Sequence, residues 1–70
     1  MHELVTLAED SLQIAWDYLA GCGKIIDQQA SAEFLLSSIQ RQMLDGERRK
    51  LMLSNRAIAA YLQQPVRLVA

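Results

Sequence analysis

Positive charge is concentrated in one short segment of the chain. Four of the seven Lys and Arg residues fall within nine positions: Arg48, Arg49, Lys50 and Arg56. Clustered cations bind phosphates, which supply most of the non-specific affinity for nucleic acid. Domains that bind nucleic acid usually have a pI above about 9, whereas this chain has a pI near 5.6. We therefore expect the cations to solvate a connection or to pair with Glu47, Asp45 or an acidic helix face, with phosphate binding as the alternative.

One thiol is the other group that could react. Cys22 lies between two glycines, and an accessible thiolate becomes nucleophilic when a neighbouring cation such as Lys24 stabilises it. The chain has no second cysteine, and its one histidine is the distant His2, so we interpret Cys22 as an incidental thiol. These two soft ligands also fall short of the four that structural zinc needs. The sequence predicts no catalytic residue, no metal site and no cofactor.

The segments that carry these groups have the composition of helices. Runs that alternate β-branched residues are missing, while strong helix formers such as Ala, Leu and Gln dominate. At about 100° per residue, residues 3–19 form an apolar arc wider than half the helix circumference, and their carboxylates lie on the other side. Such a helix packs against two neighbours or against another subunit. We expect Gly21 to end it by adopting the left-handed conformation.

A second helix is predicted over residues 28–45, with Asp27 or Ser31 as its N-cap. Its apolar stripe is narrow, and Phe34 points almost the opposite way. The Phe34 ring either covers a neighbouring loop or is exposed for a partner. We expect a break at Gly46. The alternative is that this helix continues through Gly46 and carries the basic residues on its last turns.

The third helix is predicted over residues 54–64. Ser54 is a good N-cap, and Leu53 and Ile58 have the spacing of a hydrophobic staple. Pro65 then ends the helix. The remaining residues, 66–70, are expected to form a frayed tail.

Together these helices predict an all-α fold, a small three-helix bundle with helices near 3–20, 28–45 and 54–64. A chain of 70 residues forms one domain, residues 1–70, and a domain of this size buries only about 60% of its unfolded surface. The expected core residues are Leu12, Ala15, Leu19, Ile39 and Ile58. A single cysteine cannot form a disulfide within the chain, so the stability of the domain must come from helix packing or from self-association. Any homodimer should use the part of the first helix around Val5 and Trp16.

Residues 46–61, together with residues 15–19 upstream, resemble a group of small bacterial helical proteins of unknown function. The resemblance implies a small helical cytoplasmic protein and brings no catalytic residues. The sequence also predicts a cytoplasmic location, since its start has no signal-peptide pattern and no apolar stretch approaches the length of a membrane span.

We therefore expect a non-enzymatic protein–protein interaction module that binds a protein partner or forms a homodimer. The candidate contact residues are Arg48, Arg49, Lys50, Arg56, Phe34 and Trp16. The alternative is a nucleic-acid-binding regulator that uses the basic segment 48–56. An enzyme ranks third, because three short helices rarely enclose a pocket of a few hundred Å³. No contact with a membrane is expected.

Overall fold

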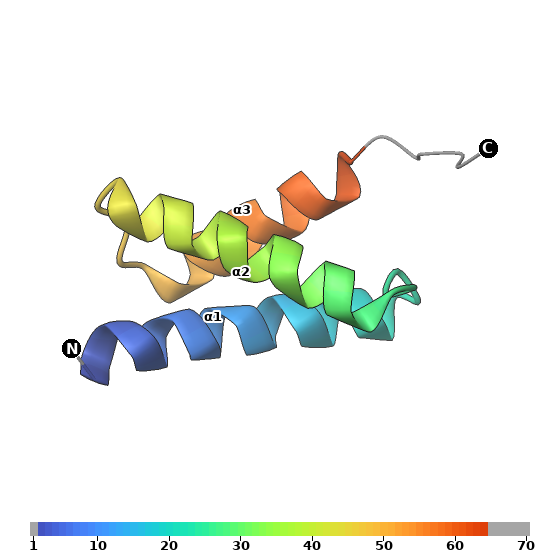
Figure 1. The fold of residues 1–70 in the computed structure, drawn as a ribbon, viewed down its shortest axis with the longest axis horizontal. Helices are drawn as coiled ribbons and strands as arrows, with labels where there is room; N and C mark the ends of the chain where they lie inside the picture. The colour runs from blue at the N-terminus through green and yellow to red at the C-terminus, as the bar shows by residue number, and fades with distance from the viewer. Residues whose placement is uncertain (1, 65–70) are drawn as a thin grey trace.

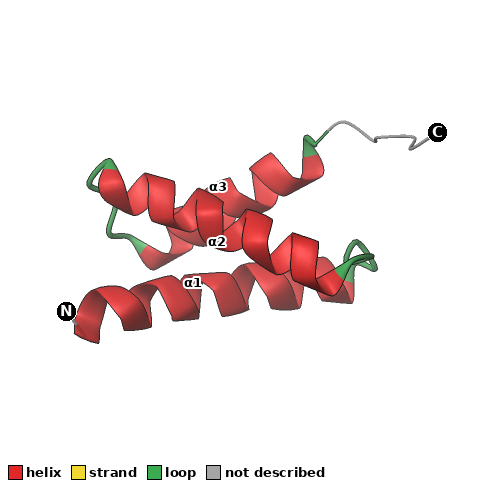
Figure 2. Ribbon diagram, in the orientation of Figure 1, coloured by secondary structure: helices red, strands yellow, loops and turns green. Residues whose placement is uncertain are grey.

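The computed structural model describes residues 2–64, which form three helices and no strand (Figures 1 and 2). They are α1 (His2–Gly21), α2 (Gln28–Leu44) and α3 (Lys50–Leu62). Helices α1 and α2 run in opposite directions, α3 crosses behind α2, and each helix packs against the other two (Figure 1). The predicted all-α three-helix bundle is therefore confirmed.

Gly23, rather than Gly21, provides the left-handed residue after α1. Its φ is 71°, a value that glycine adopts without steric cost. The N–H of Gly23 donates to the carbonyl of Ala20, and the N–H of Lys24 donates to that of Leu19. This pair of bonds is a Schellman motif, so the prediction for Gly21 was wrong by two residues.

Helix α2 ends with the same motif around Gly46, which has a φ of 101°. The N–H of Gly46 donates to the carbonyl of Met43, and the N–H of Glu47 donates to that of Gln42. The break predicted at Gly46 is confirmed, and the alternative of a helix continuing through it is wrong. At its other end α2 is capped by Asp27, whose carboxylate accepts from the N–H of Ala30 at 3.1 Å.

The predicted start of the third helix was wrong. Helix α3 begins at Lys50, with Arg49 in the N-cap position, and it ends at Leu62. Ser54 lies fully buried inside the helix, and its hydroxyl donates to the carbonyl of Lys50 at 3.0 Å. Ser54 cannot be the N-cap, because the helix already has a full turn before it.

The core is small and contains short side chains. Its fully buried apolar residues are Ala15, Leu19, Leu35, Ile39, Leu53 and Ala57. Each helix also buries one serine: Ser11, Ser31 and Ser54. These small residues let the helices approach one another closely. Of the predicted core, Ala15, Leu19 and Ile39 are confirmed, whereas Leu12 and Ile58 are half-buried at its edge.

Phe34 packs against α3 rather than against a loop. Its ring meets that of Tyr61 edge to face, with centroids 5.9 Å apart, a favourable geometry for two aromatic rings. The Tyr61 hydroxyl donates to the carbonyl of Lys24 at 2.9 Å and lies 2.8 Å from the Ser31 hydroxyl. Tyr61 therefore joins the end of α3 to the start of α2 and to the turn before it.

Residues 65–70, which include Pro65 and the tail expected to fray, lie outside the described residues. Between residues 2 and 64, no helix combines the length and the apolar character that crossing a bilayer requires.

Candidate functional site

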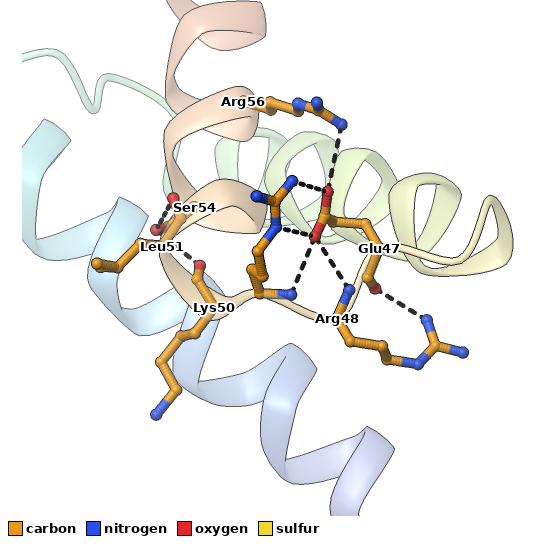
Figure 3. Close-up of polar contacts among 7 residues, drawn as sticks. Glu47, Arg48, Lys50, Leu51, Ser54 and Arg56 are labelled. Carbon is orange, nitrogen blue, oxygen red and sulfur yellow. Dashed lines mark hydrogen bonds and ion pairs between the residues drawn. The ribbon is translucent and has the colours of Figure 1, made fainter.

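The basic segment surrounds one carboxylate. Glu47 is only 12% exposed, and its Oε2 accepts from the backbone N–H groups of Arg48 and Arg49 at 3.2 and 3.1 Å. The guanidinium of Arg49 donates to both Glu47 oxygens, at 3.0 and 3.2 Å. Arg56 reaches the same carboxylate from α3, with Nη1 at 3.6 Å from Oε1 (Figure 3).

The two other cations of the segment are also engaged within the chain. Nη1 of Arg48 donates to the carbonyls of Met43 and Glu47 at 2.7 and 2.9 Å, and so satisfies the end of α2. The Lys50 ammonium pairs with Asp10 of α1 at 3.2 Å. The pairing expected with Glu47 and with the acidic helix is thus present, although an exposed pair such as Lys50 and Asp10 adds little stability.

These contacts hold Glu47 in its charged form. The side-chain hydrogen bonds from Arg49 are the main cause, helped by the N–H of Arg49, and they lower the pKa of Glu47 from 4.5 to about 2. The carboxylate in turn raises the pKa of Arg49. Glu47 therefore connects the two helices. Its N–H donates to the carbonyl of Gln42 near the end of α2, and its carboxylate accepts from the N–H groups of Arg48 and Arg49, which lead into α3.

Glu47→Gln is expected to remove an acid-dependent loss of stability. Between pH about 4.5 and about 2 the folded state binds fewer protons at Glu47 than the unfolded state does, so its contribution to the free energy of unfolding falls as the pH falls. Urea unfolding midpoints measured from pH about 5 down to about 2 should decline more steeply in the parent than in Glu47→Gln. Glu33→Gln, at an exposed position of α2, is the control and should keep the parent's slope. Equal slopes in all three proteins would contradict the role given to Glu47.

The other groups considered for chemistry lie apart from one another. Cys22 is exposed in the turn after α1. Asp10 pairs with Lys50, and Asp17 accepts from the Gln13 amide at 2.7 Å. Within the part of the chain that the structure describes, no three His, Cys, Asp or Glu residues come together as a metal site would require.

An apolar groove lies between the first half of α1 and the second half of α2. It has a volume of about 610 Å³ and is open to solvent. Its apolar lining residues are Leu4, Val5, Ala8, Leu36, Met43 and Leu44. Glu9, Gln40 and Arg48 supply its polar lining.

A second hollow continues the groove along the same two helices. Leu12 and Trp16 of α1 line it together with Ala32 of α2, and Glu9 borders both hollows. We call the apolar residues of the two hollows the α1–α2 face. They are Leu4, Val5, Ala8, Leu12 and Trp16 from α1, and Ala32, Leu36, Met43 and Leu44 from α2.

Three large apolar side chains of the α1–α2 face are exposed to solvent: Leu4, Val5 and Leu44. Leu44 is 88% exposed and Val5 is 58% exposed. A continuous apolar surface of this kind marks an interaction site more often than a single exposed residue does. The wide arc of α1 indicated its half of the face, but the contribution of Leu44 was missed, because Leu44 lies outside the narrow apolar stripe predicted for the second helix.

The six candidate contact residues do not form one site. Trp16 is half-buried on the α1–α2 face, and Phe34 is half-buried against Tyr61. The four cations surround Glu47 or extend toward α1 and α2, and only Arg48 also borders the groove. In comparisons with known proteins, no family model, no curated protein and no solved structure matches the chain significantly.

Proposed function

We propose that this protein is a non-enzymatic interaction module of the cytoplasm that binds another protein chain through its α1–α2 face. The observation that carries the proposal is the apolar groove of about 610 Å³ between α1 and α2, with Leu44 and Val5 exposed at its edges. An amphipathic helix fits a groove of this kind by placing its apolar side chains in the hollows.

The contacts of the basic segment favour protein binding over nucleic-acid binding. Arg49 and Arg56 share the carboxylate of Glu47, and Lys50 pairs with Asp10. Each of these acids cancels charge that a phosphate would otherwise meet. The three other carboxylates of α1 weaken the positive field further, and salt at physiological concentration screens what remains over about 8 Å.

Capture from a lysate of the source cells tests the proposal. The tagged chain should retain protein that nuclease treatment does not remove, and Leu44→Glu should abolish the retention because it places a charge in the groove. Leu51→Glu makes the same change on α3, at a position 67% exposed and outside the groove, and should retain the same protein. An untagged copy of this chain counts as a captured protein.

Two results would reject the proposal. One is equal retention by the parent and by Leu44→Glu. The other is retention that nuclease removes, together with salt-sensitive binding of a mixed oligonucleotide that Arg48→Glu and Arg49→Glu abolish. The second result would favour the nucleic-acid-binding alternative.

A further inference from the structure

We infer that the occupant of the α1–α2 face is a second copy of this chain, in a two-fold dimer in which α1 of each copy lies antiparallel along α2 of the other. The inference rests on the proposed function and names the partner. The two hairpins would form a four-helix arrangement, with the α3 helices on its outer sides.

The small core is the first reason for a second copy. Six apolar residues are fully buried, and two of them are alanines. Leu4, Val5 and Leu44 stay exposed on one face. Domains of this size usually gain stability from disulfides, metals or self-association, and one cysteine cannot form a disulfide within the chain. A second copy is available as a partner wherever the chain accumulates, and it would cover these exposed residues.

The area of the face is the second reason. Contact between α1 and the partner's α2 is limited by the length of α2, which has 17 residues and is about 25 Å long. Two packed helices are about 20 Å wide, since their axes lie about 8–10 Å apart. The dimer therefore covers about 500 Å² on each copy and about 1,000 Å² in total. A specific interface needs about 1,000 Å² or more, so a second copy reaches the required size.

Charge decides which helices meet. Helix α1 has no Lys or Arg, and its Glu9 borders both hollows of the face, whereas the one acid and the one arginine of α2 cancel. A two-fold axis across the helices would stack α1 on α1 and bring like charges together. An axis along the helices places α1 against the neutral α2 of the partner. The second arrangement avoids the repulsion between the two acidic helices.

The second arrangement also matches the side chains. Within one copy Val5 and Leu44 line the same groove, and Trp16 and Ala32 line the second hollow. A two-fold axis along the helices keeps the position of each residue along the helices, so Leu44 lies near the partner's Val5 and the converse contact repeats it. The small residues Ala8 and Ala32 leave room near the middle of the face for the partner's longer side chains.

Sedimentation velocity and the emission of Trp16, the one tryptophan of the chain, test the dimer. The parent should sediment as a dimer and dissociate on dilution, with a shift of Trp16 emission to longer wavelength as its ring becomes exposed. Leu44→Glu should weaken dimerisation at least about thirtyfold and keep the parent's helical circular dichroism. Leu51→Glu should behave like the parent. A parent that stays monomeric at millimolar concentration, or a Leu44→Glu variant that still dimerises, would overturn the inference.

Disulfide trapping tests the orientation. Val5→Cys and Leu44→Cys, each made with Cys22→Ser, carry one cysteine per chain, so any disulfide must join two copies. Mixing them should give a linked heterodimer. Leu12→Cys, near the middle of α1, should not link to itself, and efficient self-linking would overturn the orientation by placing α1 on α1. A monomeric parent that retains other proteins through Leu44 would reject the second copy while supporting the proposed function, whereas loss of both results would reject the two together.

Discussion

Leu19→Ala is expected to destabilise the protein by about 2–5 kcal/mol. Leu19 is fully buried and belongs to the central cluster with Leu35 and Ile39, so the shorter side chain leaves a cavity. A chain of 70 residues typically has a total free energy of unfolding of about 4–10 kcal/mol. The substitution therefore removes a large part of the stability, and urea unfolding followed by circular dichroism measures the loss.

Leu12→Ala is the comparison on the same helix. Leu12 is half-buried and belongs to the α1–α2 face, so at low protein concentration it should cost less than Leu19→Ala. If both variants unfold at the urea concentration that unfolds the parent, α1 does not contribute to the core.

Ala57→Leu is expected to lower the melting temperature by roughly 4–24 °C. Ala57 is fully buried where α3 meets the other helices, and added carbon atoms in a packed core cost about 1–3 kcal/mol. Each kcal/mol shifts the melting temperature by about 4–8 °C in a domain of this size. Thermal unfolding at a fixed protein concentration measures the shift.

Ala59→Leu provides the matched control, since Ala59 lies two residues further along α3 and is exposed. It should melt close to the parent, because Leu forms helices almost as well as Ala. Equal melting temperatures for Ala57→Leu and Ala59→Leu would show that α3 does not approach the core closely at residue 57.

The sequence predicted the fold class well because each helix has its own apolar periodicity and a short connection follows it. Helices α1 and α2 were predicted to within about one residue at each end, since Asp27 and the breaks at residues 21–23 and at Gly46 are local signals. The start of α3 was missed for a physical reason. Arg49, in the N-cap position, makes no side-chain cap hydrogen bond, and the segment before α3 is held instead by the Glu47 carboxylate, which accepts from the N–H groups of Arg48 and Arg49.

The candidate site was predicted less well than the fold. Composition showed that the basic residues are outnumbered by acids, and the pairing with Glu47 agrees with this. The α1–α2 face depends on which side of α2 meets α1, and that side is fixed by packing between segments far apart in the sequence. Phe34 illustrates the same limit, since only the position of Tyr61 explains its direction.

The buried serine of α1 makes its hydrogen bond within its own helix and does not join α1 to the other helices. The Ser11 hydroxyl donates to the carbonyl of Leu7 in its own helix at 2.7 Å. By contrast, α2 and α3 are joined through Ser31 with Tyr61, and by the Gln42 amide, which donates to the carbonyl of Leu53 at 3.0 Å. Apolar contacts constrain distance more than they constrain angle. Helix α1 is therefore held on the α2–α3 pair mainly by its apolar side chains and by the exposed ion pair of Asp10 with Lys50. A partner bound to the α1–α2 face would also strengthen the attachment of α1 to the other two helices.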